Sequence, residues 1–138
     1  MHILVVEDNK ADARLVVEAL QDVPVHRVSI VEDGVQAMAL LHRDDPYCGA
    51  LRPDLILLDL NLPQKDGRAV LAECKADPAL RHIPVVILTS TQADAEVRRM
   101  YTLGTAAYFV KPNDLDEYLS LIHMIAELWG RRARLAGG

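Results

Sequence analysis

The stretch that decides the fold spans residues 54–63 and reads DLILLDLNLP. Its middle, residues 55–58, is apolar at four consecutive positions, so a strand here would be buried on both faces. Such a strand is typical of a parallel sheet that is covered by helices on both sides. An acidic residue, Asp59, follows the strand at once. The stretch therefore predicts a central parallel strand whose carboxyl end carries a carboxylate.

Short apolar runs alternate with amphipathic stretches on both sides of this strand. The expected strands cover residues 3–6, 25–31, 55–58, 84–88 and 107–110. The expected helices cover residues 10–22, 34–43, 68–77, 94–103 and 115 to about 131. Asn9 and Asp33 are expected to cap the first two helices, because their side chains accept hydrogen bonds from free backbone amides. Five βα units predict an α/β fold, a doubly wound (βα)5 flavodoxin-like parallel sheet with strand order 2-1-3-4-5.

Composition narrows the class of protein. The chain of 138 residues suits one domain with one core. Its net charge is −5, and only Arg131, Arg132 and Arg134 make a local basic cluster, so we expect no nucleic-acid partner. No apolar run is long enough to span a membrane, so we expect no membrane partner. Two cysteines make no disulfide framework, which favours a reducing, cytoplasmic location.

Polar residues gather where the expected strands end. In this strand order the carboxyl ends of the strands meet at one rim of the sheet, beside the switch point between strands 1 and 3. The residues that follow strands 1, 3, 4 and 5 are Glu7 and Asp8, Asp59, Thr89 and Ser90, and Lys111. We therefore expect three carboxylates, a hydroxyl and an ammonium group to face one another across the switch point.

Carboxylates that lie close together repel one another, and a bound cation would neutralise their charge. Two carboxylates about 4 Å apart repel by roughly 4 kcal/mol at an effective dielectric constant of 20. Oxygen ligands without histidine or cysteine suit Mg²⁺, and the five histidines have no zinc-site spacing. Mg²⁺ with a nucleophilic carboxylate, a hydroxyl donor and a lysine forms a set suited to phosphoryl transfer. No phosphate-binding glycine loop occurs, so the expected donor is another phosphorylated protein or a small acyl phosphate.

Residues 2–129 resemble the receiver domain of bacterial two-component response regulators. The motifs that carry the resemblance are VEDN at 6–9, DLILLDLNLP at 54–63, DG at 66–67, IPVVILT at 83–89 and YFVKP at 108–112. These motifs occur in the family's order and at its spacing, which makes the match specific. The resemblance implies a domain that accepts a phosphoryl group from a histidine kinase and changes conformation to signal.

The resemblance also implies a role for each matching position. Asp59 would be the phosphoacceptor, Asp8 a direct metal ligand, and Glu7 an acid that acts largely through metal-bound water. Asn61 would supply a backbone carbonyl to the Mg²⁺ ion. Lys111 would pair with the phosphoryl group, and the peptide bond that follows it, before proline, is expected to be cis. Thr89 and Tyr108 would be the switch pair: the hydroxyl moves toward the phosphoryl group and the aromatic ring turns inward.

Finer features are similar to one group within the family. Residues 52–68, 75–78 and 111–115 look like the stand-alone receivers that partner bacterial and cyanobacterial phytochrome histidine kinases. The expected organisation is a receiver domain over residues 1–130 and a short basic tail over 131–138, with no output domain. Such a domain is not an enzyme in the usual sense, because it catalyses only its own phosphorylation and dephosphorylation.

A surplus of apolar residues on the fifth expected helix predicts a homodimer. A helix that packs on one sheet needs a single apolar stripe, and a second stripe here needs another partner. The second stripe is formed by Leu121, Met124 and Leu128, and it is extended onto the fourth helix by Val97, Met100 and Tyr101. The expected interface comprises the fourth helix, the fifth strand and the fifth helix. The alternative is that the second stripe packs within the same chain.

Other functions remain open from the sequence. The domain could be a phosphorelay intermediate or a phosphate sink rather than a terminal output. A small phosphatase with an aspartyl-phosphate intermediate would need a second acid two residues after the nucleophile, where this chain has Asn61. A binding module with a degenerate acidic pocket, or Asp59 as a merely structural acid, fits poorly with five matching site positions.

Overall fold

A computed structural model describes residues 1–23 and 27–137 of the chain, with side chains described as far as residue 130. Each strand is followed by a helix, as the sequence predicts. The elements are β1 His2–Val6, α1 Lys10–Leu20, β2 Arg27–Val31, α2 Gly34–His42, β3 Leu55–Leu58, α3 Gly67–Ala76, β4 Val85–Thr89, α4 Asp94–Leu103, β5 Ala107–Val110 and α5 Leu115–Gly137.

The sheet confirms the predicted topology. Its five strands are parallel and follow the order β2-β1-β3-β4-β5. Val6 is in register with Leu58, and Thr89 is in register with Val110. The residues that follow β1 and β3 therefore lie side by side, and Lys111, which follows β5, lies beside the end of β4.

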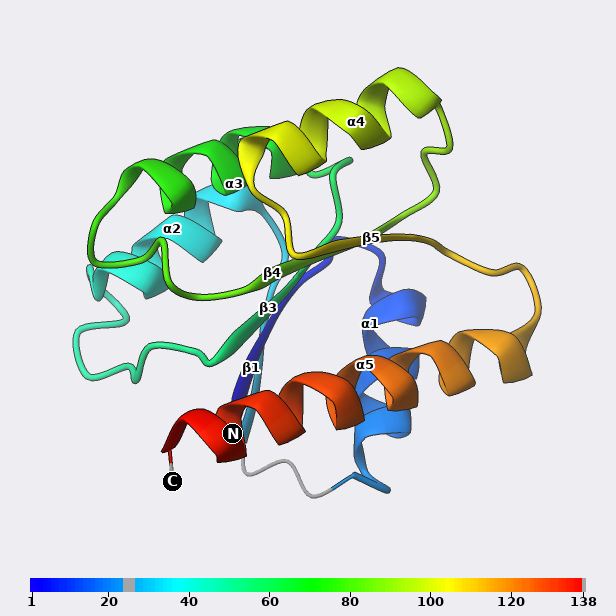
Figure 1. The fold of residues 1–138 in the computed structure, drawn as a ribbon. Helices are drawn as coiled ribbons and strands as arrows, with labels where there is room; N and C mark the ends of the chain where they lie inside the picture. The colour runs from blue at the N-terminus through cyan, green and yellow to red at the C-terminus, as the bar shows by residue number, and fades with distance from the viewer. Residues whose placement is uncertain (24–26, 138) are drawn as a thin grey trace.

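Helices cover both faces of the sheet, so the protein has three layers (Figure 1). Helices α2, α3 and α4 lie on one face, and their core includes Leu41, Leu71 and Met100. Helices α1 and α5 lie on the other face, and their core includes Ile122 and Trp129. The strands β1, β3 and β4 contribute side chains to both cores, which explains why their sequences are apolar at nearly every position.

Side chains at the helix starts fix where α1 and α2 begin. The Asn9 side chain accepts hydrogen bonds from the backbone amides of Ala11 and Asp12, at 3.0 and 3.1 Å. The Asp33 side chain accepts a hydrogen bond from the Gln36 amide at 2.7 Å. Both predicted caps are thus confirmed. Among the described residues, no helix has the length and apolar character needed to cross a bilayer.

Three predicted features change or fall outside the described residues. Val25, at the predicted start of the second strand, lies outside them, and β2 begins at Arg27. The backbone of α5 continues past residue 131 to Gly137, so the predicted tail is helical, although its arginine side chains lie outside the described residues. The peptide bond between Lys111 and Pro112 is trans, so the predicted cis bond was wrong; Asp45–Pro46 is cis instead. The intrinsic preference at such bonds is only about 0.5–1 kcal/mol, so local context decides the isomer.

Candidate functional site

The predicted carboxylates come together at the carboxyl ends of β1 and β3. The backbone amide of Asp59 donates to the Val6 carbonyl at 3.1 Å, which brings the two strand ends into contact. One carboxylate oxygen from each of Glu7, Asp8 and Asp59 lies within 4.8 Å of the others. Glu7 and Asp59 are buried, whereas Asp8 is exposed. These oxygens are hard ligands that fit a divalent cation such as Mg²⁺.

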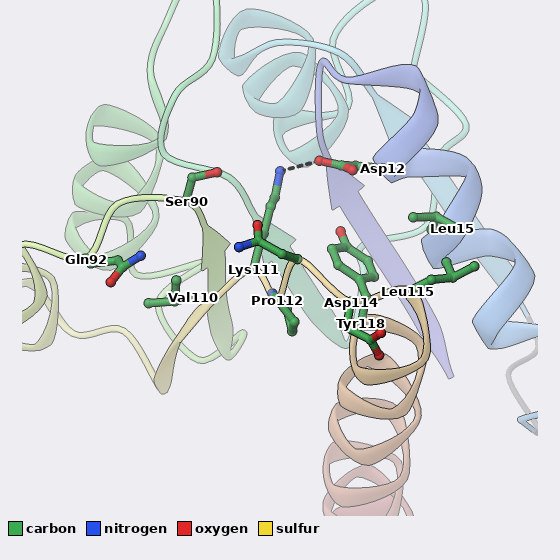
Figure 2. Close-up of a pocket in the computed structure, with 11 residues that line it drawn as sticks. Asp12, Leu15, Ser90, Gln92, Val110, Lys111, Pro112, Asp114, Leu115 and Tyr118 are labelled. Atoms are coloured by element: carbon green, nitrogen blue, oxygen red, sulfur yellow. Dashed lines mark hydrogen bonds and ion pairs between the residues drawn. The ribbon is translucent and has the colours of Figure 1, made fainter.

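The ammonium group of Lys111 contacts two acids of this cluster. The Nζ atom of Lys111 lies 2.5 Å from Glu7 Oε1, 2.9 Å from Asp59 Oδ2 and 2.9 Å from Asp12 Oδ2. Its three N–H donors are thus matched by three carboxylates, two that follow β1 and β3 and one on α1. Lys111 and Asp12 line a pocket of about 390 Å³ together with Ser90 and Tyr118. Figure 2 shows Lys111 reaching toward Asp12.

Burial and charge shift the pKa values of this group in different directions. Burial raises the pKa of Glu7 to about 7, and this outweighs the opposing hydrogen bond from Lys111. Burial would also raise the pKa of Asp59, but hydrogen bonds from Lys111 and Thr89 hold it below its usual value. Burial would lower the pKa of Lys111, but its hydrogen bonds to Glu7, Asp12 and Asp59 raise it well above the usual range. Asp59 is therefore an ionised carboxylate and Lys111 a cation at neutral pH.

The second oxygen of Asp59 is bound by neighbours on the other side. The Thr89 hydroxyl donates to Asp59 Oδ1 at 2.8 Å, and the backbone amide of Asn61 donates to the same oxygen at 3.1 Å. Thr89 is completely buried. The Asn61 side-chain amide also lies 3.4 Å from the Thr91 hydroxyl oxygen. Asn61 thus connects the site with the loop that precedes α4.

Tyr108 reaches the same loop from β5. Its hydroxyl donates to the Thr91 carbonyl at 2.7 Å, and its backbone amide donates to the Tyr101 hydroxyl at 3.1 Å. The ring is half-buried and packs against the core beneath α4. The predicted switch pair is therefore connected through a short path: Thr89 contacts Asp59, and Tyr108 contacts the residue two positions after Thr89.

A glycine lets the start of α3 lie against the backbone of the central acid. A Cβ atom at Gly67 would lie 2.2 Å from the Asp59 carbonyl oxygen and 2.7 Å from the Leu60 Cα. The preceding residue, Asp66, caps α3 by accepting hydrogen bonds from the amides of Arg68 and Ala69. The cap and the glycine together hold the β3–α3 turn close behind Asp59.

The predicted acids, Asn61, Thr89 and Lys111 lie at this rim, Tyr108 reaches it from within β5, and the structure adds Asp12. In the sequence, Asp12 is an acid in the first turn of the first helix, a place where the helix dipole alone favours a negative charge. A signal was present, since Asp12 lies in the first turn of α1, four positions after Asp8. The sequence could not indicate that its carboxylate faces Lys111, because the two residues are 99 positions apart.

Comparison with protein families gives a match over most of the chain. Residues 3–123 match the model of the response regulator receiver domain. The chain is 45% identical over 128 residues to the response regulator Rcp1 of Synechocystis sp., an alignment that covers 92% of this chain and 87% of the relative.

Two solved structures are similar in both sequence and fold. The phosphorylated cyanobacterial phytochrome response regulator RcpA is 48% identical with a TM-score of 0.90, and the match covers 93% of this chain and 92% of that one. The Mn²⁺-bound form of response regulator Rcp1 is 44% identical with a TM-score of 0.89, covering 93% of each chain.

Proposed function

Because the chain belongs to the response regulator receiver domain family, we propose that Asp59 is the residue on which it accepts a phosphoryl group. One observation carries the assignment: the buried Asp59 carboxylate has Lys111 on one oxygen and Thr89 on the other, and it also belongs to the group of three acids. A nucleophilic carboxylate with a cation and a hydroxyl donor beside it suits aspartyl-phosphate formation.

The proposed metal is Mg²⁺, with Glu7, Asp8 and Asp59 supplying carboxylate oxygens and Asn61 a backbone carbonyl. Support comes from the oxygen-only donor set and from Rcp1, whose structure contains Mn²⁺. Both ions prefer oxygen ligands, and Mg²⁺ commonly binds one or two carboxylates while keeping several waters. A bound divalent ion would neutralise negative charge on the phosphoryl oxygens.

The residues of the chain then have separate tasks. An oxygen of Asp59 attacks phosphorus, the bond from phosphorus to the donor breaks, and the leaving group departs with the electron pair. Lys111 binds a phosphoryl oxygen as a cation, and the Thr89 hydroxyl donates to another. Movement of Thr89 then changes the space near Tyr108, whose hydroxyl contact with Thr91 transmits the change to α4. The chain catalyses only its own phosphorylation and dephosphorylation.

The proposed donor is the phosphohistidine of a sensor kinase of the phytochrome type, in the cytoplasm. The similarity to RcpA, a phytochrome response regulator, and to the bacteriophytochrome response regulator RtBRR supports this partner. RtBRR is 39% identical with a TM-score of 0.74, and the match covers 86% of this chain and 74% of that one. A role as relay intermediate or phosphate sink uses the same phosphoryl chemistry.

A homodimer through α4, β5 and α5 is also proposed. The supporting observation is the exposure of large apolar side chains on these three elements, namely Tyr101, Val110, Met124 and Leu128. Two members of the predicted patch do not belong to it: Met100 is completely buried under α4, and Leu121 packs against the core between α1 and α5.

Mass spectrometry after incubation with acetyl phosphate and Mg²⁺ tests the phosphoacceptor assignment. The wild-type protein should gain one phosphoryl group, and Asp59→Asn or an excess of chelator should abolish the gain. Asp33→Asn is the matched control, because it also removes an acid at a strand end and asparagine caps a helix as well as aspartate does. Labelling of Asp59→Asn at the wild-type rate would contradict the assignment.

A further inference from the structure

The acid at the third position of α1 is not used to cap its own helix. An acidic or amide side chain at this position often returns to the backbone amide of the capping residue. Here the Asn9 amide instead donates to Glu7 Oε2 at 3.2 Å. The Asp12 carboxylate is therefore available for another partner, and its Oδ2 atom lies 2.9 Å from Lys111 Nζ.

Asp12 lies outside the proposed metal group. That group consists of Glu7, Asp8 and Asp59, and the Lys111 ammonium lies between Asp59 and Asp12. Of the three acids that contact Lys111, two belong to the metal group, and Asp12 is the third. Its side chain is 25% exposed at the edge of the pocket, so water reaches it more easily than it reaches Glu7 or Asp59.

We propose that Asp12 is a positioning residue, which holds the Lys111 ammonium in place for phosphoryl transfer to Asp59; this inference rests on the proposed function. A lysine side chain has a flexible four-carbon stem, so its ammonium must be fixed by its acceptors. Glu7 and Asp59 would also have to serve a bound metal ion, since both belong to the group of three acids, and phosphorylation would occupy an oxygen of Asp59. Asp12 is the acceptor that neither event removes.

This role predicts a specific kinetic defect in Asp12→Ala. The maximal rate of phosphorylation by acetyl phosphate should fall about tenfold, because a misplaced group stabilises the transition state less well. The Mg²⁺ concentration for half-maximal rate should stay unchanged, because Asp12 does not belong to the metal group. Glu18→Ala removes the same charge from an exposed position of the same helix and should match wild type in both quantities.

A double substitution separates positioning from other effects. If Asp12 acts through Lys111, Asp12→Ala should have no further effect on the rate in a Lys111→Ala background. The rates are measured by mass spectrometry of the labelled protein, and circular dichroism confirms that each variant is folded. The inference would be overturned if Asp12→Ala slowed phosphorylation as much in the Lys111→Ala background as it does in the wild-type protein. It would also be overturned if Asp12→Ala alone were phosphorylated at the wild-type rate or faster. Failure of the wild-type protein to label at all would instead overturn the proposed function.

Discussion

At the scale of single residues, Glu7 has the most unusual position in the site. It is a buried acid whose pKa burial raises to about 7, although Lys111 donates a hydrogen bond to it. A carboxylic acid must lose its proton before it can serve a metal ion or a metal-bound water. Glu7 therefore places a proton and a divalent cation in competition near neutral pH.

The affinity for Mg²⁺ should consequently depend on pH. The neutral acid predominates below the pKa and the carboxylate above it, so the affinity should rise about tenfold between pH 6 and pH 8. Isothermal titration calorimetry at several pH values measures this change. In Glu7→Gln, which cannot ionise, the affinity should be lower and nearly independent of pH over the same range. A wild-type affinity that stays constant between these pH values would contradict the prediction.

The sequence predicted most of this site because its residues follow strands. Glu7, Asp59 and Lys111 each come directly after an apolar run, and parallel strands bring such positions to one rim. Asp12 comes from a helix, where an acid in the first turn has a simpler explanation in the helix dipole. Its role depends on the direction of one side chain, which residue spacing does not determine.

At the scale of elements, the start of α3 depends on Gly67. Any side chain there would meet the backbone of Asp59 and Leu60, which cannot move aside as a flexible side chain would. Gly67→Ala should therefore lower the free energy of unfolding by about 1–3 kcal/mol, the usual cost of overpacking. It should also slow phosphorylation, because the strain falls on the acceptor residue.

Gly49→Ala is the matched control, because a Cβ atom there meets nothing within 4 Å. Urea unfolding followed by circular dichroism compares the two variants with wild type. Gly49→Ala should leave the stability almost unchanged. Equal stabilities for the two variants would mean that the β3–α3 turn relaxes without cost.

The spacing of apolar residues along α4 did not correctly predict which of them face the core. Its apolar residues are few, and the sequence placed Val97, Met100 and Tyr101 together on an exposed patch. In the structure Met100 is the buried residue of α4, while Tyr101 is 49% exposed. Consecutive residues point about 100° apart on a helix, so only contacts with α3 and β5 determine which of the two faces the core.

At the scale of the whole molecule, the exposed apolar side chains on α4, β5 and α5 predict self-association. Met124→Asp places a charge on the exposed face of α5, where Met124 is 45% exposed. It should weaken the dimer at least about tenfold, because a buried unpaired charge is costly. Light scattering over a concentration series, with and without phosphorylation, measures the effect.

The control for this experiment is Val35→Asp. Val35 is also an exposed apolar residue, at 55%, but it lies on α2, outside the proposed interface. It should leave the dimer intact. A wild-type protein that stays monomeric at high micromolar concentration, phosphorylated or not, would contradict the proposed dimer.

The separation of the two cores has a consequence for spectroscopy. The chain has one tryptophan, Trp129, and it lies in the core between α1 and α5, whereas Tyr108 packs against the core beneath α4. The fluorescence of Trp129 should therefore change when the α1–α5 side unfolds and should stay nearly constant when Thr89 and Tyr108 switch.

A tryptophan that reports the switch must lie on the opposite face of the sheet. In a Trp129→Phe background, Tyr101→Trp would place the only indole on α4, beside Tyr108. Its emission should then change on phosphorylation, while that of Trp129 in the parent protein does not.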